Sequence, residues 1–171
     1  PHTEWPPLAT LGRCGDEQLA VKFAEALALE LKITGITLDF APVLDVGTNP
    51  ANPVIGDRAI GKNAKDVANL GRAIVSAIQQ AGVAACGKHF PGHGETSSDS
   101  HLCLPVVDLD EARLREVEIK PFCAAIAADV SALMTAHVSY PALDDRWPAT
   151  LSSVIIGTLL RDELCFDGLI I

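Results

Sequence analysis

One fourteen-residue segment of the chain is dense in side chains that can exchange protons. Residues 88–101 read KHFPGHGETSSDSH and hold three histidines, a lysine and two acids. The segment follows an apolar stretch, residues 82–87, that is typical of a buried strand. Ionisable groups at the end of a buried strand are typical of the active site of a parallel α/β fold. This segment is therefore the main indication of function.

Asp99 and His101 have the spacing of a general acid/base pair. In an extended segment residues i and i+2 point the same way, so the Asp99 carboxylate can fix the His101 tautomer and raise its basicity. The alternative is a solvated loop in which Asp99 caps the next turn. Gly92 and Gly94, with the serines at 97–98, indicate a mobile loop that closes over a substrate.

Lys88 and His89 stand where the predicted strand ends. A lysine in that position needs a partner or a ligand, because a buried charge is costly when unpaired. Lys88 and His89 together can donate hydrogen bonds to hydroxyl or carboxylate oxygens. The structural alternative is an ion pair between Lys88 and Asp39 or Asp45.

Arg58 and His137 are two further candidates. Arg58 lies in the Gly- and Pro-rich segment 52–61 and can clamp a carboxylate or sugar hydroxyls in bidentate fashion. Its alternative is a surface contact with Asp57, which stabilises little. For His137 we expect a core histidine bonded to a backbone carbonyl.

A metal site formed by His89, His93 and His101 is not favoured. Their spacing matches no common zinc pattern, and Pro91 and Gly92 break the helix that an HExxH site requires. We therefore expect no metal and no cofactor.

Composition narrows the class of protein. The 171 residues are 49% hydrophobic and carry a net charge of −9, which argues against nucleic-acid binding because phosphates need a basic surface. No apolar run approaches the roughly 20 residues of a membrane span. The five cysteines form no CxxC pair, so we expect small buried residues in a reducing compartment, and hence a cytoplasmic location.

The hydrophobic pattern alternates helices with apolar strands, which predicts a parallel sheet. The predicted helices cover residues 16–32, 63–80, 110–126 with a kink at Pro121, and 152–164; the predicted strands cover 36–41, 83–86, 132–137 and 169–171. A (β/α)₈ barrel and a doubly wound open sheet both fit this order. Polar residues at several strand ends favour the barrel, and a full barrel of about 250 residues means that the chain holds about four of eight units.

Five segments together resemble the bacterial β-N-acetylglucosaminidases of glycoside hydrolase family 3. They are LDFAPVLDV (38–46), NPVIGDRAIG (52–61), GKHFPGHGETSSDSH (87–101), MTAHVSYPALD (134–144) and LRDELCFDGLII (160–171). The combination of KHFPGHG with DSH is specific to this branch, because the β-glucosidases of the family lack the DSH loop. The resemblance covers essentially the whole chain.

The resemblance implies a (β/α)₈ TIM barrel that removes terminal β-linked N-acetylglucosamine by a retaining double displacement, in the recycling of peptidoglycan muropeptides. His101 is then the general acid/base and Asp99 its assistant. Arg58, Lys88 and His89 bind the sugar. Residues 1–171 are then the central part of a single catalytic barrel domain that continues at both ends.

The nucleophile of this branch is an aspartate in a Ser-Asp-Asp type motif directly after the FDGLII strand, and residues 1–171 contain no such motif. We therefore expect this piece alone to be inactive. Two alternatives stay open. One is a phosphorylase that uses phosphate in place of water; the other is a non-catalytic sugar-binding barrel.

Overall fold

The computed structural model describes residues 3–98 and 103–171. Four parallel strands form one sheet in chain order: β1 (Leu38–Asp39), β2 (Ala84–Phe90), β3 (Ala132–Thr135) and β4 (Leu169–Ile170). A helical segment connects each strand to the next. The predicted α/β class with a parallel sheet is thereby confirmed.

The first long helices begin where the sequence predicts. After the short α1 (Leu8–Cys14), α2 (Glu17–Ile33) starts at Asp16, whose carboxylate accepts the backbone N–H groups of Gln18 and Leu19. The helix α3 (Ala64–Gln80) starts at Asn63, whose side chain accepts two backbone N–H groups in the same way. Both caps satisfy donors that a helix leaves unpaired in its first turn.

The third predicted helix is present but divided. It consists of α4 (Glu111–Arg113), the π-helical η2 (Leu114–Glu118) and α5 (Lys120–Ile126). The break falls at Ile119, two residues before Pro121, because a proline has no N–H to continue the ladder. The fourth predicted helix is η4 (Val154–Glu163), which is also π-helical, and the short 3₁₀ turn η3 (Ala149–Leu151) precedes it.

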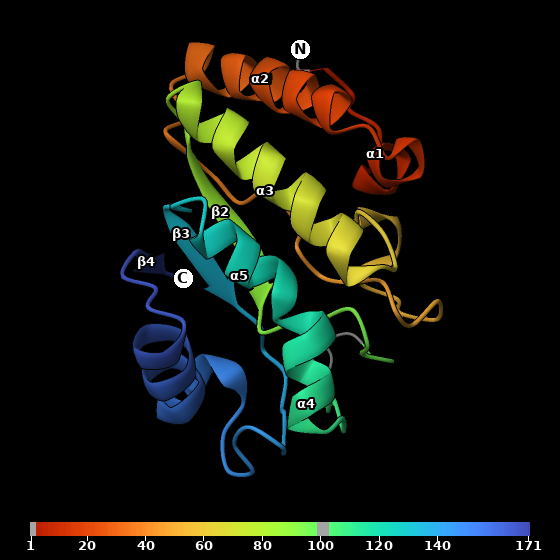
Figure 1. Ribbon diagram of the computed structural model, residues 1–171, viewed down its shortest axis with the longest axis vertical. Coiled ribbons are helices and arrows are strands. Elements are labelled where there is room, and N and C mark those ends of the chain that lie inside the picture. Colours follow the sequence, from red (N-terminus) through yellow and green to blue (C-terminus); the bar gives the residue numbers. More distant parts are fainter. Residues whose placement is uncertain (1–2, 99–102) are drawn as a thin grey trace.

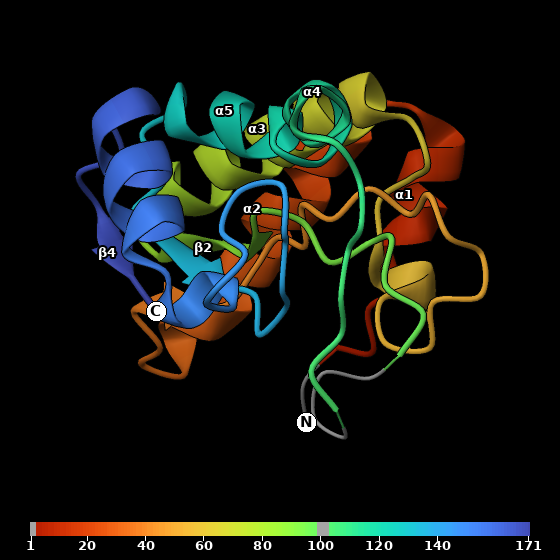
Figure 2. The ribbon, with the colours of Figure 1, turned by 90° about the horizontal axis from the view of Figure 1, so that it is seen from below.

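The helices α2, α3 and α5 lie side by side as one layer (Figure 1). Seen after a 90° turn, α3 and α5 lie on one side of the strands (Figure 2). The main core fills the space between them, and α3 contributes most to it with fully buried side chains such as Ile74 and Ile78. Each such isoleucine stabilises the fold by about 2 kcal/mol through removal of apolar surface from water.

The strands differ from prediction at their ends. β1 is shorter than the predicted 36–41, but pairing resumes beyond it, because Val43 bridges Lys88 and the Leu44 N–H donates to the Lys88 carbonyl at 2.7 Å. β2 is longer than the predicted 83–86 and runs to Phe90. Lys88 and His89 therefore lie within a strand and not after it.

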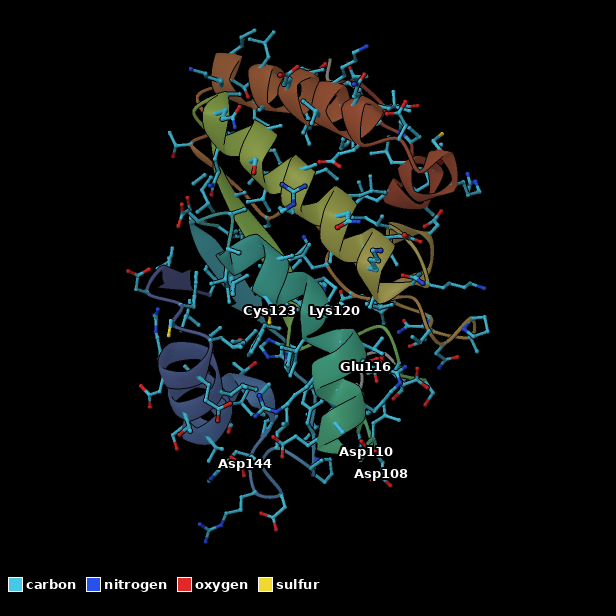
Figure 3. All side chains as sticks on the ribbon, in the orientation of Figure 1. Asp108, Asp110, Glu116, Lys120, Cys123 and Asp144 are labelled. Carbon is cyan, nitrogen blue, oxygen red and sulfur yellow. The ribbon has the colours of Figure 1, made fainter. Side chains whose placement is uncertain are left out.

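The expectation of buried cysteines is wrong for four of five. Only Cys86 is buried; Cys14, Cys103, Cys123 and Cys165 are exposed. Figure 3 shows Cys123 on α5. Helical spacing alone does not tell which side of a helix faces the sheet for small residues. Across residues 3–98 and 103–171, no helix is both long and apolar enough to span a bilayer.

Candidate active site

Four of the candidate side chains line one cavity of about 410 Å³. They are Arg58, His89, His93 and His137, and the remaining wall is formed by Val54, Met134, Thr135, Ala136, Thr150 and Ile171. Lys88 lines an adjoining hollow of about 260 Å³, and Arg58 borders both spaces. Side chains from β2, from the segment after β3 and from the loop after β1 thus converge at one end of the sheet.

Asp45 is the buried anchor of this arrangement. It is fully buried, and one carboxylate oxygen accepts the backbone N–H groups of His89 at 3.1 Å and His93 at 2.6 Å. The other oxygen lies 2.7 Å from Nδ1 of His89. A carboxylate only accepts, so His89 carries its proton on Nδ1, and Nε2 remains for a ligand.

The protonation of Asp45 follows from these contacts. Burial on its own raises the pKa of the Asp45 carboxyl, but hydrogen bonds from the His89 ring and from the backbone N–H groups of His93 and His89 lower it further than burial raises it. The pKa of Asp45 therefore lies below its ordinary value. Asp45 is therefore an anion at neutral pH, hydrogen-bonded to His89 and to the His93 backbone.

Lys88 is half-buried and makes no ion pair within 4.0 Å with any residue in the described ranges. Burial lowers the pKa of Lys88, and the nearby charge of Arg58 lowers it further, against the attraction of Asp39. Burial in turn raises the pKa of Asp39. The predicted alternative of an ion pair from Lys88 to Asp39 or Asp45 is therefore wrong: neither carboxylate lies within 4.0 Å of the Lys88 ammonium, and Asp45 is paired with His89.

Arg58 ends the 3₁₀ turn η1 (Gly56–Arg58), and its Nη1 donates to the Val54 carbonyl at 3.0 Å. Its guanidinium borders the cavity, and its charge contributes to the lowered pKa of His93, after burial. In the described part of the chain, Arg58 makes no ion pair with Asp57, so the alternative of a surface contact between them is wrong. Arg58 keeps further donors for a ligand, because a guanidinium carries five.

The described part of the loop after β2 is anchored. The amide nitrogen of buried Asn52 donates to the carbonyls of His93 at 2.8 Å and Gly94 at 3.0 Å, and to the Thr96 hydroxyl at 3.1 Å. A β-carbon on Gly94 would lie 1.8 Å from the Val46 carbonyl oxygen. Gly94 therefore serves close backbone packing, and the glycines of this segment are not simply a sign of mobility.

A second support lies under Gly92. A β-carbon there would lie 2.7 Å from Cβ of Glu118, and the buried Tyr140 hydroxyl donates to the Gly92 carbonyl at 2.7 Å. Glu118 is buried and accepts both its hydrogen bonds from Arg113, at 2.8 and 2.6 Å. Burial raises the pKa of Glu118, while Arg113 opposes that shift. Glu118 of η2 and the Tyr140 side chain thus support the loop after β2 at Gly92.

His137 differs from prediction. It is exposed rather than in the core, and its Nδ1 lies 2.7 Å from the Thr150 hydroxyl rather than against a carbonyl. His137 follows β3 by two residues, so it leaves the sheet at the same end as the other candidates. The sequence pattern missed this because the partner, Thr150, comes from the distant turn η3.

The predicted acid/base pair, Asp99 and His101, lies outside the described residues. The structure therefore places Arg58, Lys88 and His89 at adjoining hollows and describes the loop as far as residue 98. Within the two described ranges, no group of three His, Cys, Asp or Glu side chains has a metal-binding arrangement.

Three site residues were missed or assigned no role by sequence reasoning: Asp45 as the partner of His89, Asn52 as the anchor of the loop, and His93 as a wall of the cavity. The one signal in the sequence was that Asp45 follows an apolar run and lies at a strand end. The arrangement offers a hollow lined by one guanidinium and by imidazole groups, which is suited to a ligand rich in hydroxyl groups.

Comparison with known proteins gives a consistent result. A family model described as the glycosyl hydrolase family 3 N terminal domain matches residues 1–171. Beta-hexosaminidase A of Pseudoalteromonas piscicida is 43% identical, over 94% of this chain and 29% of the relative. The beta-hexosaminidase of Thiobacillus denitrificans is 40% identical, over 97% of this chain and 47% of the relative. The chain thus spans about half the length of these relatives or less.

The chain is also similar to solved structures of proteins with related names. A glycoside hydrolase family 3 beta-N-acetylglucosaminidase from Paenibacillus sp. str. FPU-7 is 50% identical with a TM-score of 0.96, over 98% of this chain and 32% of that chain. NagZ from Neisseria gonorrhoeae, in complex with N-trifluoroacetyl-D-glucosamine, is 36% identical with a TM-score of 0.90, over 96% of this chain and 50% of that chain.

Proposed function

Because the chain belongs to glycosyl hydrolase family 3, through its N-terminal domain, we propose that the protein carrying it is a β-N-acetylhexosaminidase. It removes terminal non-reducing β-linked N-acetylglucosamine. The observation that carries the proposal is the convergence of Arg58 and His89 on one cavity, beside the loop that leads to Asp99 and His101.

The chemistry of the described residues supports a sugar ligand. Arg58 supplies several hydrogen-bond donors. Lys88 makes no ion pair with any described residue, so its ammonium group can also donate to a ligand. His89 is held in one tautomer by Asp45, so its Nε2 is set for one hydroxyl group. The related NagZ in complex with N-trifluoroacetyl-D-glucosamine supports an N-acylated glucosamine as the ligand.

The proposed reaction is a retaining double displacement. A carboxylate nucleophile attacks the anomeric carbon while protonated His101 gives its proton to the leaving glycosidic oxygen. Water then attacks the glycosyl-enzyme, neutral His101 takes the proton of that water, and the sugar leaves with its β configuration. Asp99 orients the imidazole and stabilises its charged form. The family resemblance implies that the nucleophile is an aspartate following the FDGLII strand.

We also propose that the four parallel strands are part of a (β/α)₈ barrel and that residues 1–171 are its central part. The convergence of polar side chains at one end of the sheet supports this, since barrel enzymes build their sites there. A role in muropeptide recycling in the cytoplasm belongs to the same proposal. The exposed thiols of Cys14 and Cys123 support a reducing compartment, and cell fractionation tests it.

The function is tested with 4-nitrophenyl N-acetyl-β-D-glucosaminide. We expect turnover by the protein, about a 10²- to 10⁴-fold loss of kcat in His101→Ala, and a raised KM in Arg58→Ala. Arg146→Ala is the matched control, because that side chain is exposed and does not line the cavity. Turnover of the β-glucoside with none of the N-acetylglucosaminide would overturn the proposal.

The same assay separates the two alternatives. A phosphorylase would need inorganic phosphate for turnover and release a sugar 1-phosphate, which phosphorus NMR detects. A non-catalytic barrel would bind N-acetylglucosamine without any turnover. The hydrolase releases free N-acetylglucosamine at the same rate with and without phosphate.

A further inference from the structure

We propose that His137 is a further substrate-binding residue, whose Nε2 accepts a hydrogen bond from a hydroxyl of the sugar in the cavity. This inference rests on the proposed function and deepens it. It concerns a residue for which the sequence pattern indicated only a place in the core.

The first support is position. In the register of the sheet Lys88 is opposite Met134 and Phe90 is opposite Thr135, so β2 and β3 reach the site together. His89 lies between the two β2 residues, and His137 follows the last residue of β3 by two positions. Both imidazoles line the cavity that Arg58 borders. His137 is exposed toward it, which a purely structural histidine has no need to be.

The second support is a fixed tautomer. The Thr150 hydroxyl has one proton, and it donates that proton to the Ala136 carbonyl at 3.0 Å. Toward His137 the Thr150 oxygen is therefore an acceptor, and Nδ1 of His137, at 2.7 Å, is the donor. In the neutral ring Nε2 then carries the lone pair. Thr150 gives His137 the orientation that Asp45 gives His89, with a neutral partner in place of an anion.

The third support is the balance of donors and acceptors. Arg58 only donates. The hydroxyl of Thr135 bonds the Ile171 carbonyl and Thr150, and Thr150 is engaged as described. Nε2 of His137, like Nε2 of His89, therefore supplies an acceptor that Arg58 cannot. A sugar hydroxyl both donates and accepts, so it is suited to a site that offers a guanidinium and a lone-pair imidazole together.

The test compares His137→Asn with His137→Gln in the full protein. The asparagine amide nitrogen stands near Nδ1 and keeps the donor to Thr150, but removes the group at Nε2; glutamine places an amide near Nε2. We expect His137→Asn to lower kcat/KM by about 5- to 50-fold and His137→Gln to recover part of it. The loss should vanish for one deoxy analogue of 4-nitrophenyl N-acetyl-β-D-glucosaminide, namely the one that lacks the partner hydroxyl.

Unchanged kcat/KM in His137→Asn, or an equal loss on the 3-, 4- and 6-deoxy substrates, would overturn the inference. Thr150→Ser and Thr150→Val form a second, matched pair. We expect the serine variant to behave as wild type, because serine keeps the hydroxyl that accepts from Nδ1 of His137. We expect the valine variant to lose activity, because valine has no hydroxyl to hold His137 in that tautomer. If His137→Asn does not fold, unchanged kcat/KM in Thr150→Val overturns the inference.

Failure of the proposed function gives a different result. If the wild-type protein binds N-acetylglucosamine in calorimetry but does not turn over the substrate, the proposed enzymatic function is overturned. The His137 variants are then compared by their Kd for N-acetylglucosamine. Binding that is equally tight in wild type and His137→Asn overturns the inference alone. Absence of both turnover and binding overturns both.

Discussion

Asp45 shows how much of the site depends on a residue that no ligand touches. Its two oxygens accept two backbone N–H groups and one imidazole N–H, and all three donors belong to the segment 89–93. One buried carboxylate thereby sets the path of the chain and the tautomer of His89. Charge-assisted hydrogen bonds of this kind are stronger than neutral ones, so the segment has little freedom.

We expect Asp45→Asn to lower the free energy of unfolding at pH 7 by about 3 kcal/mol, because an amide cannot accept all three donors. The pKa of Asp45 is depressed in the folded protein, so its contribution is present at neutral pH and is lost as pH falls below about 4. The difference between wild type and variant should therefore shrink toward pH 3. Urea unfolding across this range measures it.

Asp162→Asn is the control, because Asp162 is exposed, and its change should stay within about 0.5 kcal/mol. A difference between wild type and Asp45→Asn that is constant with pH would show that folding does not lower the pKa of Asp45.

A second residue-scale prediction concerns the use of histidine as acid/base. A neutral imidazole repels an anionic muropeptide less than a carboxylate does. His101→Glu should therefore lose about fivefold more kcat/KM on an anionic N-acetylglucosaminyl muropeptide than on neutral chitobiose, corresponding to about 1 kcal/mol of repulsion in a solvated site. Added salt should narrow the gap. Equal losses on both substrates would contradict the hypothesis.

At the scale of elements, loops from different strands hold one another. Asn52, in the loop after β1, donates to three groups in the loop after β2, and Thr48 donates to Glu95 across the same boundary. From the other side, η2 contacts Gly92 through Glu118. The loop that leads to the proposed acid/base pair is thus held by contacts with two other segments, the loop after β1 and η2.

A matched pair of glycine variants tests this support. In Gly94→Ala the new β-carbon meets the Val46 backbone oxygen at 1.8 Å, so the loop must move. In Gly157→Ala, inside η4, nothing lies within 4 Å. We expect Gly94→Ala to reduce kcat at least tenfold, since misplacing catalytic groups by about 1 Å is costly. Gly157→Ala should keep full activity and gain up to about 1 kcal/mol of stability.

At the scale of the whole molecule, the sheet has two outer strands, β1 and β4, and one helix-covered face (Figures 1 and 2). Arg58 at the cavity and Lys88 at the adjoining hollow bring two cationic side chains together in a chain whose net charge is −9. The segment with the proposed acid/base pair and the proposed sugar-binding residues are all within residues 1–171, whereas the Ser-Asp-Asp motif implied by the resemblance is not.

We therefore expect a purified polypeptide of residues 1–171 to show no turnover of 4-nitrophenyl N-acetyl-β-D-glucosaminide, because the first displacement has no nucleophile. Assaying this piece beside the complete protein at equal concentration measures it. Turnover comparable to that of the complete protein would show that the nucleophile lies within residues 1–171.

Local signals in the sequence predicted local structure well. Asp16 and Asn63 cap helices through atoms two and three residues away, and both are visible as patterns. The pairing of His89 with Asp45 joins residues 44 apart, and no short pattern specifies it. His137 was misjudged for the same reason, because its partner comes from another element. Lys88 and His89 were singled out because ionisable residues at the end of an apolar strand are conspicuous on their own, and Arg58 because it lies in a Gly- and Pro-rich segment.

The irregular register of β2 against β3 has a consequence for insertions and deletions. Two steps along β2, from Lys88 to Phe90, match a single step along β3, and His89 is the additional residue. Deleting one residue here would restore an even ladder but turn Phe90 away from the core, where its ring meets Phe122 at 5.3 Å. We therefore expect homologues to show substitutions along residues 87–94 but no insertion or deletion there.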